Sequence, residues 1–89
     1  MMNFKQKELA EQLFNKVKNK FPEIELITIA RSPDDSSHIL IHVVPPEDED
    51  KKIAMRSYAS KKSHEILLKF GYWLSIISNK KEPEEIVTK

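Results

Sequence analysis

The chain has 89 residues, 39% hydrophobic and 33% charged, with 15 Lys or Arg against 14 Asp or Glu and a formal net charge of +1. This length suits one domain with a thin two-layer core. The near-neutral balance gives no general attraction to nucleic acid or to an anionic membrane. The absence of cysteine excludes disulfides, thiolate metal sites and cysteine catalysis.

The N-terminal residues carry charge from Lys5 onward and lack the apolar core of a signal peptide. The longest uncharged apolar block, residues 70–79, is much shorter than the roughly 20 residues that cross a bilayer. We therefore expect a cytoplasmic protein that does not enter a membrane. We expect residues 1–78 to form the single domain and residues 79–89, which are rich in charge, to form a solvated tail.

The first predicted element is an amphipathic helix between Phe4 and Phe21, because apolar residues recur there at helical spacing. Pro22 ends it. Residues 23–31 and 38–44 are rich in β-branched side chains and predict two strands. The residues between them, 32–37, have the composition of a turn, so the two strands predict an antiparallel hairpin.

The second half of the chain predicts a helix followed by a third strand. The acidic run Glu47–Asp50 suits the positive end of a helix dipole, and Gly71 suits a left-handed cap after Phe70. Residues 72–78 predict the last strand. The order is α-β-β-α-β, which predicts an α+β fold with two layers, in which two helices pack on one face of a three-stranded sheet.

An alternative is a break in the second helix near Ser57–Ser63, where small residues gather. The order would then be α-β-β-α-α-β, which resembles the type II arrangement of KH-domain RNA-binding proteins. That family grips RNA with a GXXG loop between its central helices. Ser57–Ser63 contains no glycine, so the resemblance is one of element order and implies no functional residue in this chain.

Strand alternation predicts which side chains face the helices. The inward residues are predicted to be Ile24, Leu26, Thr28, Ala30, Ile39, Ile41, Val43, Tyr72, Leu74 and Ile76. The opposite, open face is predicted to carry Glu25, Ile27, Ile29, Arg31, His38, Leu40, His42, Val44, Trp73, Ser75 and Ile77. Both sets are apolar, whereas a solvated sheet face is normally polar. Either the register contains a bulge, or another chain covers the open face.

The chain contains no pattern of residues that predicts a catalytic, metal or cofactor site. His38 and His42 lie four residues apart on a strand, about 13 Å, which is too far for one zinc ion. His64 is expected at the core boundary, and its pairing with Ser60 lacks an orienting acid and oxyanion donors. The acidic run has neither the spacers nor the glycine of a calcium loop. We therefore expect that the protein is not an enzyme.

The second helix also raises two questions about charge. Its lysines share one outward face and could contact phosphates, weakly and with strong salt dependence. These nucleic-acid candidates are Lys51, Lys61, Lys62 and Lys69. Arg56 falls within the apolar arc of the same helix, so it is either buried against acidic or serine partners or exposed beside a helix break.

The sequence favours a small non-catalytic protein-interaction module that forms a homodimer through the open face of its sheet. The expected partner is a second copy or another protein, with nucleic acid as the alternative. The interface residues predicted for the open face are Ile27, Ile29, His38, Leu40, His42, Val44, Trp73 and Ile77.

Overall fold

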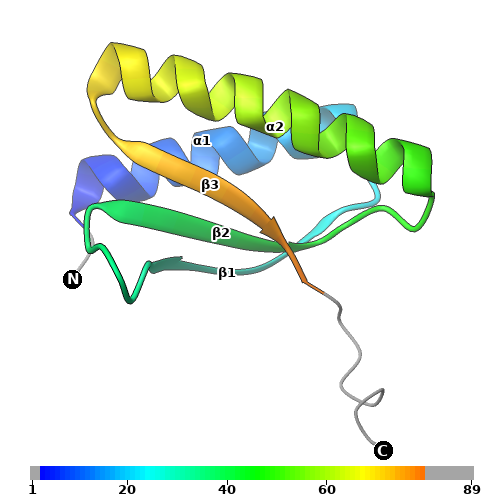
Figure 1. Ribbon diagram of the computed structural model, residues 1–89, viewed down its shortest axis with the longest axis horizontal. Helices are drawn as coiled ribbons and strands as arrows, with labels where there is room; N and C mark the ends of the chain where they lie inside the picture. The colour runs from blue at the N-terminus through cyan, green and yellow to red at the C-terminus, as the bar shows by residue number, and fades with distance from the viewer. Residues whose placement is uncertain (1–2, 80–89) are drawn as a thin grey trace, which may run out of the picture.

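The computed structural model describes residues 3–79 and shows two helices lying on one face of a three-stranded sheet (Figure 1). This confirms the predicted α+β fold and its order α-β-β-α-β. The elements are α1 (Phe4–Lys20), β1 (Glu25–Arg31), β2 (His38–Val44), α2 (Glu49–Phe70) and β3 (Trp73–Ser78). Of the predicted tail, residues 80–89 lie outside the described residues.

The sheet has the strand order β1-β2-β3, with β2 in the centre. β1 and β2 form the predicted antiparallel hairpin, and β2 pairs in parallel with β3 after the crossover through α2. α1 contacts β1 and β2, whereas α2 contacts β3 and α1. Each helix therefore covers a different part of the same face, and no helix or strand of residues 3–79 lies over the opposite face (Figure 1).

Both helices begin and end where local chemistry satisfies the free backbone groups. The Asn3 side chain accepts from the Gln6 N–H at 2.8 Å and the Gln6 side chain accepts from the Asn3 N–H at 3.1 Å, which is a capping box. Asp48 caps α2 by accepting from the Lys51 N–H at 3.0 Å. Gly71 ends α2 with φ 79°, the left-handed conformation that glycine adopts freely. The acidic run is thus a helix start, as predicted.

The core lies between the helices and the sheet, and residues from every element contribute to it. β2 supplies Ile39, Ile41 and Val43, each fully buried, and β3 supplies Leu74. These positions confirm the predicted inward set of β2 and of Leu74. The remaining buried apolar residues of the core are Leu9, Ala10, Leu13, Val17, Phe21, Ile24, Met55 and Ala59.

The predicted facing of β1 is wrong beyond its first residues, because the register shifts between Leu26 and Thr28. A β-bulge adds one residue to a strand, and every later side chain then changes face. Ile29, predicted on the open face, pairs with Ile41 and packs against the core.

Three further β1 residues change face with Ile29. Arg31 pairs with Ile39 on the helix side. Thr28 and Ala30, predicted inward, pair with His42 and Leu40 and so lie on the open face. The bulge thus replaces two predicted open-face residues by two smaller ones.

The second helix is continuous from Glu49 to Phe70, so the alternative with a break and its KH-like order do not apply. Arg56 is exposed although no break occurs beside it, an outcome that neither sequence alternative included. His64 is also exposed and does not lie at the core boundary. The reason is that α2 rests on the sheet through a narrow stripe, in which only Met55 and Ala59 are buried. No helix within residues 3–79 is long and apolar enough to cross a membrane.

Candidate functional site: the open face of the sheet

The open face is formed by alternate residues of all three strands. The pairings of β2 with β1 and β3 define its members. They are Glu25, Thr28, Ala30, His38, Leu40, His42, Val44, Trp73, Ser75 and Ile77. Glu25 is the one Lys, Arg, Asp or Glu side chain among them, although 33% of the chain is charged. Glu25, paired with Val44, stands at one corner of the face.

Six of the predicted interface residues pair on this face, Ile29 does not, and Ile27 lies in the bulge, outside the paired register. His38, Leu40, His42 and Val44 follow β2 through the centre of the face, and the β3 residues Trp73 and Ile77 lie beside them as predicted. Ile27 has no partner in the register, because it occupies the bulge, and it is 46% exposed. Ile29 lies on the covered side.

The bulge explains which residues sequence reasoning missed. Thr28 and Ala30 join the face only because the alternation of β1 reverses within that strand. The run of apolar residues on both parities of β1 was the signal of an irregular strand, but it did not give the position of the bulge.

One hydrogen bond holds each of the two histidines of the face. The His38 ring stacks on Trp73 with centroids 3.6 Å apart and planes 3° apart, and its Nε2 lies 2.8 Å from the Ser75 Oγ. At the other end, the His42 Nδ1 lies 2.6 Å from the Asn79 Oδ1. Each contact joins β2 to β3 or to the residue after it. Both imidazoles are thus positioned by partners within the chain.

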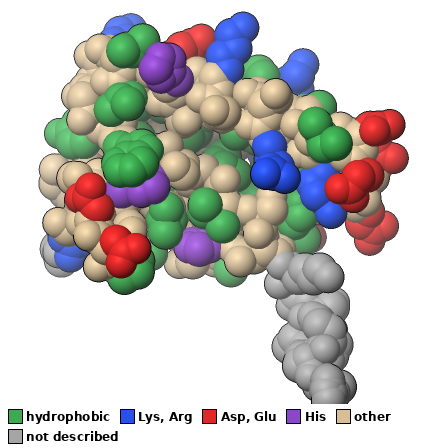
Figure 2. Space-filling view, viewed as in Figure 1, with side chains coloured by type: hydrophobic (Ala, Val, Ile, Leu, Met, Phe, Trp, Pro, Cys, Tyr) green, Lys and Arg blue, Asp and Glu red, His purple; other side chains and the backbone are tan. Residues whose placement is uncertain are grey.

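The open face combines apolar side chains, most of them half-buried, with polar ones. Leu40, Val44 and Ile77 are half-buried by their neighbours, while Trp73 is 47% exposed. In Figure 2, hydrophobic and histidine side chains lie over the strands, and carboxylates gather at the start of α2 and near the β1–β2 turn. Basic side chains and a further carboxylate lie along α2 at the top of this view.

His38 and His42 lie too far apart along β2 to hold one metal ion between them. Within residues 3–79 there is no group of three or more His, Asp or Glu side chains that could hold a metal ion. The strand spacing that separates His38 from His42 leads to the same result. The chemistry available on this face is apolar contact, aromatic stacking and hydrogen bonding.

The lysines proposed for nucleic acid are partly neutralised by carboxylates of the same chain. Lys51 pairs with Glu23 at 3.3 Å and Lys62 with Glu65 at 3.6 Å. The Lys69 Nζ lies 5.6 Å from the Phe70 ring centroid, and Lys61 is exposed. These contacts leave only part of the predicted basic face available to phosphates.

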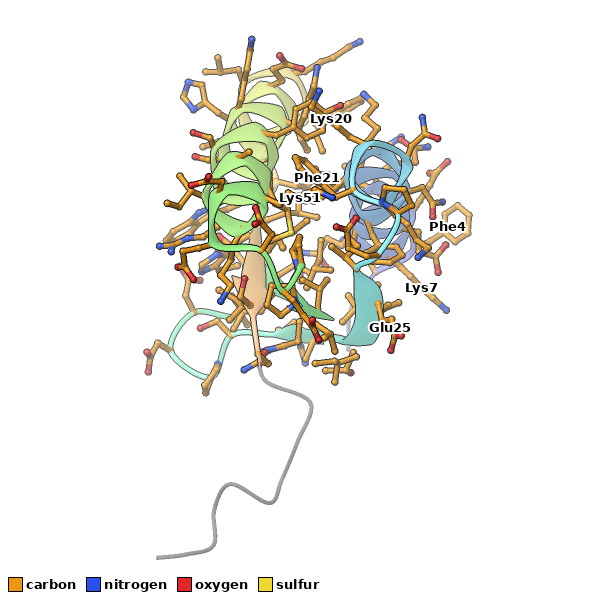
Figure 3. All side chains as sticks on the ribbon, turned by 90° about the vertical axis from the view of Figure 1, so that its right-hand side faces the viewer. Phe4, Lys7, Lys20, Phe21, Glu25 and Lys51 are labelled. Atoms are coloured by element: carbon orange, nitrogen blue, oxygen red, sulfur yellow. The ribbon has the colours of Figure 1, made fainter. Side chains whose placement is uncertain are left out.

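A second group of aromatic and basic side chains lies where the helices approach each other. Figure 3 shows Lys20, Phe21 and Lys51 on this side. The Phe21 and Tyr58 rings meet edge to face with centroids 6.2 Å apart, and the Lys20 Nζ lies 5.3 Å from the Tyr58 centroid. These side chains fasten α1 to α2, which is a structural role.

The carboxyl group of Glu23 has a pKa below its usual value of 4.5. A hydrogen bond from its own backbone is the largest cause, and the hydrogen bond from Lys51 adds to it. Because Glu23 lies between α1 and β1 and Lys51 lies in the first turn of α2, this pair ties the start of α2 to the rest of the helical layer.

Comparison of the chain with protein-family models, with curated proteins and with solved structures gave no match. The open face is therefore interpreted from its own chemistry.

Proposed function

We propose that the protein is a small non-catalytic interaction module that forms a homodimer through the open face. The observation that carries the proposal is a surface over three strands whose one charged residue, Glu25, stands at a corner, in a chain rich in charge. The cores of protein interfaces are depleted in charged residues and enriched in aromatic ones. On a sheet face that stays exposed to water, the side chains are normally polar or charged.

A second copy is the partner that fits this surface most simply. A two-fold axis lets one patch contact itself, so no separate complementary surface is needed. Apart from Glu25 at its corner, the face offers no charge for an oppositely charged partner to pair with. Leu40 lies at the middle of the central strand, flanked by Ala30 on β1 and Ser75 on β3. Its small neighbours leave room for an apolar side chain of the partner subunit.

The intrachain hydrogen bonds reduce the cost of removing water from the face. A buried polar group that loses water without gaining a partner costs about 1–3 kcal/mol. One ring nitrogen of His38 and one of His42 already have partners in Ser75 and Asn79, so only the other nitrogen of each ring would need a partner in the interface. The apolar area is on the order of several hundred Å² per chain, at or below the roughly 800 Å² of a standard interface. We therefore expect a dimer of moderate affinity.

Replacement of Leu40 by Lys tests the proposal, because it places a charge at the centre of the face and leaves the core untouched. Sedimentation velocity at tens of micromolar should show self-association for the parent and a loss of this contact in Leu40→Lys. The matched control is Leu68→Lys, since Leu68 is 73% exposed on α2 and its replacement should leave association unchanged. Circular dichroism should show that both variants fold.

Two results would contradict the proposal. One is a parent protein that sediments as a monomer at every concentration. The other is equal association of the parent and Leu40→Lys. Specific RNA binding at physiological salt that is lost in a Lys61→Glu/Lys62→Glu variant would instead support the nucleic-acid alternative.

A further inference from the structure

The two edges of the sheet differ in how they are protected against pairing with another strand. The β1 edge is interrupted by the bulge after Leu26 and carries Glu25 and Arg31 at its ends. Proteins use such charges and bulges to prevent edge-to-edge association. The β3 edge, Trp73–Ser78, contains no charged residue and no proline, and its pairing with β2 is regular. Among the strands of residues 3–79, the β3 edge is thus the one without a bulge, a charge or a proline.

The backbone of β3 presents hydrogen-bonding groups at this edge. The Asn79 N–H donates to the Val43 carbonyl of β2 at 2.8 Å. Backbone groups along a strand point alternately to its two sides, so every second residue from Asn79 is directed toward β2. The residues between them, Leu74, Ile76 and Ser78, direct their N–H and C=O groups away from β2. No other strand of residues 3–79 lies beside them.

A shallow groove runs along this edge between β3 and α2. The α2 side is lined by Arg56, Ala59, Ser60 and Ser63, and the β3 side by residues 75–77. Ser60 is exposed, and Ser63 donates its hydroxyl to the Ser60 carbonyl at 3.1 Å. Small side chains at this point allow a second helix to approach α2 closely.

We propose that β3 pairs antiparallel with β3 of a second copy, forming a continuous six-stranded sheet. The two-fold axis passes beside Ile76, so that Leu74 lies opposite Ser78 of the partner subunit. The residues with outward backbone groups then face each other in hydrogen-bonded pairs. Because the groove places Ser60 near Ile76, the same axis brings the two α2 helices together at Ser60.

The exposed apolar residues of α2 favour a second copy over an unrelated extended peptide. Ile53 and Leu67 stand seven residues before and after Ser60, and they are 58% and 38% exposed. Antiparallel α2 helices centred on Ser60 bring Ile53 of one copy beside Leu67 of the partner subunit. A peptide strand added alone would leave both uncovered. Arg56 and its copy lie on opposite sides of the axis, about two helical turns apart, which limits their repulsion.

The contact between the β3 edges does not cover the open face. It therefore does not depend on the proposed dimer through that face. If both contacts form, an edge dimer associates through its open faces and closes as a tetramer. Each contact can be removed separately, because Leu40 lies in the face and Ser60 lies on α2 beside the edge. The parent protein is therefore expected to sediment as a tetramer at high concentration.

Ser60→Glu tests the edge contact, since it places two carboxylates at the closest approach of the helices. The matched control is Ala54→Glu, which adds the same side chain at an exposed position about a third of a turn around α2. Ser78→Pro removes an N–H directed to the free edge at the end of the strand. We expect Ser60→Glu and Ser78→Pro to convert the tetramer to a dimer, Leu40→Lys to do the same, and Ser60→Glu/Leu40→Lys to give a folded monomer.

The outcomes separate the two contacts. Association that is unchanged in both Ser60→Glu and Ser78→Pro would overturn the edge proposal and leave the open face as the interface. A parent dimer lost in Ser60→Glu but kept in Leu40→Lys would support the edge and contradict the proposed function. Loss of the edge contact when the chain is ended at Asn79 would also overturn the pairing of β3 with its copy, because residues 80–89 would then be needed.

Discussion

The two faces of the sheet are built from alternate residues of the same strands, yet they differ in how far the rest of the chain buries them. On the covered face Ile39, Ile41 and Val43 are fully buried under the helices. On the open face Leu40 and Val44 are only half-buried, and nothing in the described part of the chain covers them. Folding of a single chain requires only that one face of the sheet be buried. The second face carries one charged residue, Glu25 at its corner, and this composition is the basis of the proposed interface.

The largest expected effect is the difference in stability between a substitution on the covered face and one on the open face. Ile41→Ala should lower the free energy of unfolding by about 3–4 kcal/mol, because it opens a cavity in a fully buried site. Leu40→Ala should cost about 1 kcal/mol in the dissociated chain, since Leu40 is only partly covered there. Urea denaturation at submicromolar concentration measures both. Equal losses would mean that Leu40 has a core role that its exposure does not indicate.

A smaller effect concerns acid stability, which we assign to the helical side of the molecule. The lowered pKa of Glu23 means that its carboxylate stabilises the fold above its usual value of 4.5, and that this contribution is lost as the pH falls through the folded-state pKa. Glu23→Gln should therefore be slightly less stable at pH 7 and should lose less stability than the parent between about pH 5 and pH 3.

Thermal unfolding across this pH range provides the measurement. Asp34→Asn is the control, because Asp34 is exposed in the β1–β2 turn and its side chain takes part in none of the ion pairs found in residues 3–79. If Glu23→Gln and Asp34→Asn gave identical profiles, the Glu23–Lys51 contact would not contribute to the acid response.

Regular alternation made most of the sheet predictable from the sequence. In β2, Ile39, Ile41 and Val43 form a uniform apolar set that can only be the covered face, and the remaining residues follow. β1 could not be resolved in the same way, because Ile27 and Ile29 are as apolar as Ile24 and Leu26. The bulge is set by pairing with β2, a tertiary effect that local composition does not contain.

The exposure of α2 was unpredictable for a related reason. A helical wheel gives the angles between side chains but not how deeply the helix sits on its neighbours. α2 contacts β3 along the sheet edge and α1 on its other side, so that a narrow stripe is buried and Ile53 and His64 are left in solvent. The stacking of His38 on Trp73 likewise depends on the β2–β3 register, which places these residues side by side.

Trp73 offers a direct view of the open face, because it is the single tryptophan of the chain and is 47% exposed. Acrylamide quenching of its fluorescence therefore reports whether this face is in contact with water. The measurement compares submicromolar protein with protein at tens of micromolar, for the parent and for Leu40→Lys.

We expect the quenching constant of the parent to fall by at least about half at the higher concentration, as the second copy covers Trp73, and that of Leu40→Lys to stay constant. Parent protein that associates by sedimentation while the quenching of Trp73 remains at its dilute value would show that the open face stays in water, and would contradict the assignment of this face as the interface.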